Sequence, residues 1–137
     1  MKLTKIHFVV AIIIIAISSR LIPHPPNFTP ITAVALFSII HFKNKYLSIL
    51  LPIFCLFISD LIIGISIINL FVYFSFILIS CVGYFFGKIN IKSVLLSSLI
   101  FFIITNFGVW LIGYPKTIEG FISCYIAAIP FFGWTIT

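Results

Sequence analysis

Apolar residues occur along this chain in runs about as long as a bilayer is thick, separated by short polar or proline-bearing turns. A membrane-spanning helix needs about 20 such residues, so 137 residues leave room for five or six spans in one domain, 1–137. The pattern therefore predicts an all-α fold, a polytopic transmembrane helix bundle. The predicted spans are Ile6–Leu21, Ile31–Phe42, Tyr46–Gly64, Asn69–Gly87 and Ser93–Ile112, followed by an apolar stretch over Gly120–Thr137.

The last apolar stretch allows two interpretations. It is either a sixth span, or a short outer helix that ends near Pro130, with the true final span beginning near Trp134 and missing from this sequence. We favour the second, because Pro130 and Gly133 interrupt the run and no basic residue closes it. On that interpretation the chain is truncated before its final span.

Composition supports a membrane protein and excludes a soluble one. The chain is 63% hydrophobic, with a mean hydropathy of +1.37, whereas soluble domains are about 45–50% apolar. The net charge of +6 follows the turns. Six lysines lie before the first span or in alternate turns, and so on one side of the membrane: Lys2, Lys5, Lys43, Lys45, Lys88 and Lys92. Only Arg20 and Lys116 lie on the opposite side. This asymmetry predicts a cytoplasmic N-terminus in a multi-pass protein of the bacterial inner membrane. The distribution of basic residues is therefore explained by membrane topology, and no nucleic acid partner is expected.

The sequence lacks the usual patterns of metal and catalytic sites. Cys55, Cys81 and Cys124 lie inside apolar runs without CxxC spacing, which is typical of buried small side chains. No His or carboxylate pattern predicts a metal site, and no phosphate-binding loop or catalytic triad is suggested. We therefore expect no cofactor and no enzyme activity.

The segment Arg20-Leu-Ile-Pro-His-Pro-Pro-Asn-Phe-Thr-Pro30 breaks the helical pattern. Its prolines remove backbone N–H groups and restrict the residues before them, so it is not continuous helix. Non-helical backbone at the edge of a bilayer persists only where protein or water satisfies it. Arg20, His24 and Asn27 are therefore candidates for a polar site.

Three polar residues inside the spans are predicted to share one layer. Arg20, Asp60 and Asn106 each lie about 13–14 residues into their span, or about 20 Å from the inner surface at ~1.5 Å per residue. This layer lies towards the outer side, as does the proline-rich segment. A carboxylate such as Asp60 at membrane depth usually faces the bundle interior and has a partner.

Two functional interpretations stay open at these positions. Arg20 and Asp60 are either a structural ion pair or, unpaired, free to bind an anionic or zwitterionic ligand. Asn106 and Trp110 share a helix face at i, i+4, which suits hydrogen bonding and stacking in a pocket. The alternative is helix packing through Gly108 and Gly113, with Trp110 as an interfacial anchor.

The proline-rich segment and four further motifs carry a family resemblance. These motifs are Ala33-Val-Ala-Leu-Phe37, Ser59-Asp60 with Gly64, Thr105-Asn-Phe-Gly-Val-Trp110 and Cys124-Tyr-Ile-Ala-Ala-Ile-Pro-Phe-Phe132. Together they resemble a family of small bacterial integral membrane proteins of unknown function. In that family the sequence usually continues through another span after the Pro-Phe-Phe element.

More remotely, the chain is similar to the S components of energy-coupling-factor vitamin transporters. That similarity implies six helices, both termini cytoplasmic, a ligand pocket near the outer face and docking to transporter coupling subunits. One departure concerns that docking. Ala11 and Ala16 are five residues apart, whereas many S components carry alanines four apart where they meet the coupling subunit.

The leading hypothesis is an inner-membrane protein that binds a small polar solute at its outer side, as the substrate-capture part of a transporter. Arg20 would meet a carboxylate or phosphate, and Trp110 would stack on the solute. The full set of candidate ligand-binding residues is Arg20, His24, Asn27, Asp60, Asn106 and Trp110. The rival hypothesis is a structural or assembly protein without a ligand, and a membrane enzyme using His24 and Asp60 ranks last.

Overall fold

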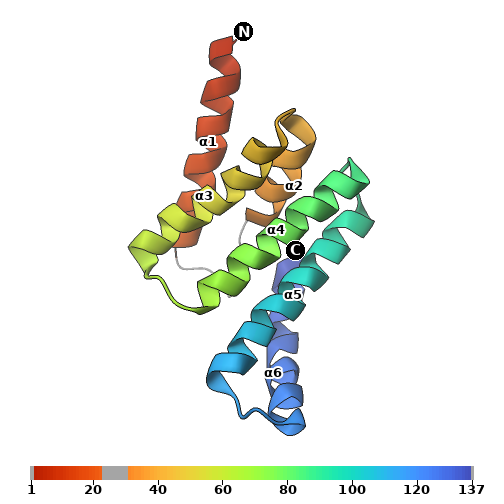
Figure 1. Ribbon diagram of the computed structural model, residues 1–137. Helices are drawn as coiled ribbons and strands as arrows, with labels where there is room; N and C mark the ends of the chain where they lie inside the picture. Colours follow the sequence, from red (N-terminus) through yellow and green to blue (C-terminus); the bar gives the residue numbers. More distant parts are fainter. Residues whose placement is uncertain (1, 23–30, 137) are drawn as a thin grey trace.

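The computed structural model describes residues 2–22 and 31–136, and this part of the chain folds into helices and contains no strand. The helices are α1 Lys2–Leu21, α2 Ile31–His41, α3 Lys45–Ile63, α4 Ile68–Phe86, α5 Ile91–Gly113 and α6 Ile118–Ile136 (Figure 1). The all-α class is confirmed, and helices α1 to α5 match the five predicted spans within a few residues. Within the described residues, α3, α4 and α5 are long and apolar enough to cross a membrane.

Helix α6 differs from the favoured expectation. It continues through Pro130 to Ile136, so the prediction of a helix end near Pro130 is wrong. Proline also lies inside α3, at the buried Pro52. Each proline removes one backbone hydrogen bond, a loss that apolar membrane helices tolerate because neighbouring groups and small backbone adjustments compensate.

Helix α4 is at the centre of the packing, in contact with α2, α3 and α5 (Figure 1). Helix α1 packs on α3 and α2, whereas α6 packs on α5, so these two helices lie at opposite edges. The core lies among α1, α2, α3 and α4. Its buried residues are Ala16, Val34, Ala35, Leu36, Cys55, Leu56, Phe76 and Ile79.

Small residues let these helices approach closely, as is typical of membrane helix pairs. A Cβ added at Gly108 would lie 2.6 Å from the ring of Phe71, so α5 and α4 meet there. Gly83 lies against Leu36 of α2 in the same way, with a built Cβ 3.2 Å away. Gly113, which shares the face of Asn106 and Trp110, has open space around it. The packing interpretation is therefore confirmed for Gly108 and wrong for Gly113.

The turns gather at two ends of the molecule (Figure 1). The start of α1 and the α2–α3 and α4–α5 turns lie together; we call this the basic end, because the six lysines of the alternate-turn pattern occur there in the sequence. Asn44 and Asn90 cap α3 and α5 at this end. The last turn of α1 and the α3–α4 and α5–α6 turns lie at the other end, which we call the Arg20 end.

Candidate functional site

Arg20 and Asp60 form an ion pair, so the structure answers whether these two residues contact each other. Arg20 Nη1 lies 2.7 Å from Asp60 Oδ1, joining the last turn of α1 to the last turn of α3. The Asp60 side chain is 2% exposed, whereas that of Arg20 is 18% exposed. The carboxylate is thus buried in the helix interface, and the guanidinium reaches from the surface to meet it.

A side-chain hydroxyl and a backbone carbonyl of α3 supply further acceptors for Arg20. Nη1 also donates to Ser59 Oγ at 2.5 Å and to the Leu56 carbonyl oxygen at 3.2 Å. Ser59 Oγ in turn donates within α3, 2.8 Å from that same Leu56 carbonyl oxygen. Spacings of three and four residues place Leu56, Ser59 and Asp60 on one face of the helix, towards α1.

Tyr73 of α4 completes the site and was missed by the sequence analysis. Its hydroxyl donates to Asp60 Oδ2 at 2.7 Å, so both carboxylate oxygens accept charge-assisted hydrogen bonds. Asp60 lies three residues before the end of α3 and Tyr73 five residues after the start of α4, on either side of the turn where Gly64 has φ +120°. Two helices joined by so short a turn run antiparallel, which brings residues on either side of the turn together. This feature of the sequence could have identified Tyr73 as a partner of Asp60. We call Arg20, Leu56, Ser59, Asp60 and Tyr73 the Arg20 network.

Asn106 and Trp110 lie on α5 and make local contacts. Asn106 Nδ2 donates to the Phe102 carbonyl oxygen of its own helix at 2.7 Å. Trp110 Nε1 donates to the Pro115 carbonyl oxygen at 3.0 Å, and its ring packs edge-on against Phe121 of α6 at 5.4 Å. The Trp110 contacts join α5 to the α5–α6 turn and to α6, whereas the Asn106 bond stays within α5.

The predicted polar layer therefore separates into two clusters. No hydrogen bond or ion pair joins Asn106 or Trp110 to the Arg20 network in the part of the chain that the structure describes. Helix α4 lies between α3 and α5, and its Phe71 packs against Phe107 with ring centroids 6.4 Å apart. Depth along a span places residues in one layer, but helix order and rotation decide which of them are neighbours.

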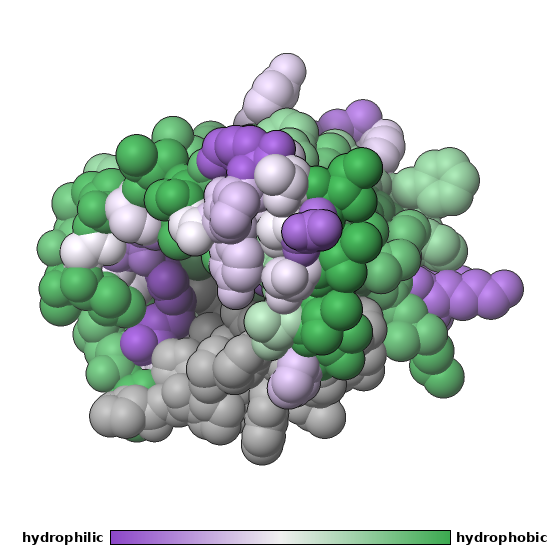
Figure 2. Space-filling view, turned by 90° about the horizontal axis from the view of Figure 1, so that it is seen from below, coloured by the Kyte–Doolittle hydropathy of each residue, from purple (hydrophilic) through white to green (hydrophobic). Residues whose placement is uncertain are grey.

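Figure 2 shows the Arg20 end of the molecule. Hydrophilic residues gather in the middle of this face and in a hollow at one side, with hydrophobic residues around them. The predicted site residues His24 and Asn27 lie outside the described residues. Among those described, no three His, Cys, Asp or Glu side chains group as a metal site would require.

The fold defines an all-helical protein in which three apolar helices are compatible with a membrane environment. The chain belongs to the Family of unknown function (DUF6580), whose family model matches residues 1–137. No curated protein and no solved structure matches the chain. Membership of a family of unknown function agrees with the sequence resemblance, and the family description gives neither a location nor an activity.

Proposed function

We propose that this protein is a multi-pass protein of the bacterial inner membrane that captures a small solute carrying a carboxylate or phosphate group. The lysine pattern supports a cytoplasmic basic end and an outer Arg20 end. The similarity to S components supports a role as the substrate-binding part of a transporter. Energy would then come from coupling subunits or an ion gradient, and we propose no catalytic role.

The observation that carries this proposal is the geometry of Arg20. A guanidinium presents five N–H donors in a planar fork, and every polar contact of Arg20 within the described residues is made by Nη1. The side chain is 18% exposed and lies at the end of α1, immediately before the proline-rich segment. We propose that the other edge of the fork, which makes no polar contact with the described residues, receives an anionic group.

The Arg20 network would prepare this edge for binding. Contacts to α3 hold the guanidinium in one orientation, so little side-chain entropy is left to lose when a solute binds. A carboxylate or phosphate could then form two parallel hydrogen bonds, which a lysine at this position would not reproduce. Arg20→Lys is for this reason the sharpest test of a binding role.

The test measures thermal unfolding of the purified protein in neutral nanodiscs across matched sets of carboxylates, phosphates and their uncharged analogues. We expect at least one anionic solute to raise Tm, and Arg20→Lys to abolish the shift while the unliganded protein stays folded. Lys116→Gln, at the same end of the molecule, is the charge control and should keep the shift. If no anionic solute raises Tm, or if Arg20→Lys keeps the full response, the proposal is wrong.

A second candidate, a structural or assembly role, rests on a different observation. Both oxygens of Asp60 have partners within the protein, and Asn106 and Trp110 are bonded to neighbouring backbone carbonyls. The polar residues would then only lock helices together. This candidate prevails if no solute binds while removal of either Arg20 or Asp60 destabilises the protein at least as strongly as removal of both.

A further inference from the structure

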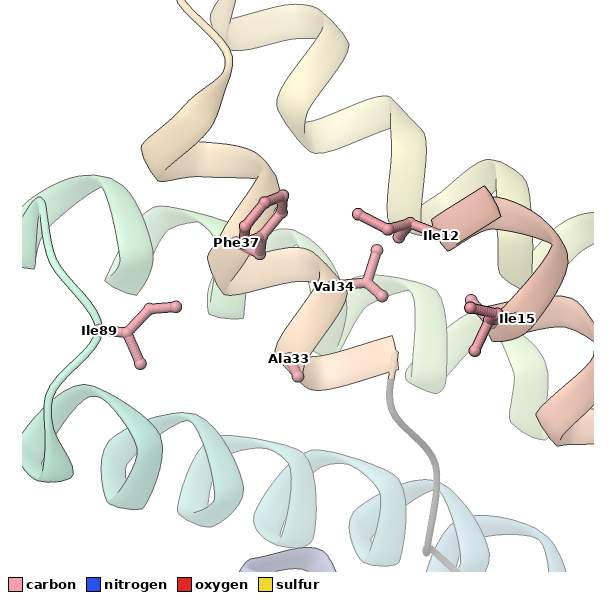
Figure 3. Close-up of a pocket in the computed structure, with 7 residues that line it drawn as sticks. Ile12, Ile15, Ala33, Val34, Phe37 and Ile89 are labelled. Carbon is pink, nitrogen blue, oxygen red and sulfur yellow. The ribbon is translucent and has the colours of Figure 1, made fainter. Parts of the chain in front are cut away.

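An apolar groove crosses α2 between α1 and the α4–α5 turn (Figure 3). Its volume is about 300 Å³. Ile12 and Ile15 of α1 form one wall, Ile89 of the α4–α5 turn forms the other, and Ala33, Val34 and Phe37 of α2 lie between them. The described residues that line the groove are all apolar, so its surface suits a hydrocarbon chain.

The wall at Ile89 belongs to the basic end. Lys88 immediately precedes Ile89, Lys92 follows in the first turn of α5, and both lysines are exposed. The acidic residues of the sequence are Asp60, paired with Arg20, and Glu119, at the start of α6. Neither lies in the turns of the basic end, so its lysines have no acidic neighbour there.

Along α2 the groove covers Ala33 to Phe37, about 6 Å at ~1.5 Å per residue, and the distance from Ala33 to the end of α2 compares with one leaflet of a bilayer. From Ala33 to His41, where α2 ends, the helix rises about 12 Å at ~1.5 Å per residue. Half of a hydrocarbon core of about 30 Å is about 15 Å. A lipid chain lying along α2 would therefore bring its head group to the level of the α4–α5 turn and its lysines.

We infer that this groove binds one acyl chain of an anionic phospholipid from the leaflet at the basic end, with the phosphate group facing Lys88 and Lys92. Basic residues beside a gap between membrane helices are the usual setting for anionic head groups. A zwitterionic lipid fits the groove but gains less from the lysines, and a free phosphate ester fits the lysines but not the groove. This groove shares no lining residue with the Arg20 network, and its binding of a lipid does not depend on the proposed solute site.

The experiment compares three probes on the purified protein in neutral detergent, by native mass spectrometry and by the shift in Tm. The probes are phosphatidylglycerol, phosphatidylcholine with the same acyl chains, and glycerol phosphate. We expect phosphatidylglycerol to bind best, phosphatidylcholine more weakly, and glycerol phosphate to give no shift.

Two variants separate the charged and the apolar halves of the site. Lys88→Gln with Lys92→Gln should weaken phosphatidylglycerol about 30-fold, since each lysine near an anionic group contributes about 1 kcal/mol, and should weaken phosphatidylcholine much less. Ala33→Phe should fill the groove and weaken both lipids. Lys116→Gln, at the Arg20 end, is the charge control and should change neither.

Equal affinity for the two lipids, a full response to glycerol phosphate, or unchanged lipid binding in the double lysine variant would each overturn the inference. Ala33 is exposed, so its substitution should leave the fold intact, and circular dichroism checks this. If Ala33→Phe does not fold, Ile89→Ser tests the apolar half from the opposite wall. Lipid binding that survives a folded groove variant also rejects the site.

Discussion

Asp60→Leu should be among the most destabilising single substitutions in this protein. It removes the charge partner of Arg20 and the acceptor of the Tyr73 hydroxyl, at a position only 2% exposed. Breaking a buried ion pair on one side costs about 3–5 kcal/mol. Because Arg20 is 18% exposed, it is less buried than its partner, and we expect a loss near the lower end, about 3 kcal/mol.

Stability should return stepwise as the other partners are replaced by apolar residues. Arg20→Met together with Asp60→Leu leaves no unpaired charge and only the Tyr73 hydroxyl without its acceptor, which costs about 1–3 kcal/mol. Adding Tyr73→Phe removes that hydroxyl as well. We therefore expect the triple variant to approach the wild type, and the single variant to be the least stable of the series.

Reversible unfolding by sodium dodecyl sulfate in mixed micelles, followed by circular dichroism, measures these differences. Glu119→Leu is the matched control, since Glu119 is the other acid of the chain and is exposed in the first turn of α6. Its loss should change the unfolding free energy by less than about 1 kcal/mol. A single variant that costs no more than this control, or a triple variant less stable than Asp60→Leu, would refute the reasoning.

Two further predictions concern helix contacts. Tyr73→Phe alone removes one hydrogen bond to a carboxylate and should lower the unfolding free energy by about 1.5–3 kcal/mol. Tyr84→Phe, on an exposed ring, is the control and should change the unfolding free energy little. Equal effects of the two substitutions would contradict the Arg20 network. Gly108→Ala places a methyl group 2.6 Å from the Phe71 ring and should cost about 1–3 kcal/mol, measured by the same unfolding assay. Gly113→Ala meets open space and should be tolerated, so a larger loss there than at Gly108 would contradict the packing described for α5.

Most of the helix pattern could be predicted from the chain, and the last helix could not. Turn signals such as Asn44, Gly64, Gly87 and Asn90 stand at the ends of apolar runs, and each lies where a helix begins or ends. Pro130 gave a misleading signal. Its ring removes only one backbone bond, and an otherwise apolar helix continues past it.

The candidate site was predicted in part, because one-dimensional depth counting does not specify neighbours. It placed Arg20 and Asp60 at one level, and they do pair at 2.7 Å. It also placed Asn106 at that level, but α4 separates α5 from α3. The Asn106 amide bonds instead within its own helix.

The sequence by itself determined the all-α class, because the length and hydropathy of its runs indicate the first five helices before any packing is known. It also determined that polar atoms such as Asp60 need partners, since a carboxylate among apolar helices is costly when unpaired. Only the tertiary structure decided which partners those are. The rotation of each helix and the order α1, α3, α4 bring Arg20 and Tyr73 to the two oxygens of Asp60. Those choices depend on contacts between residues distant in the chain, which no local pattern specifies.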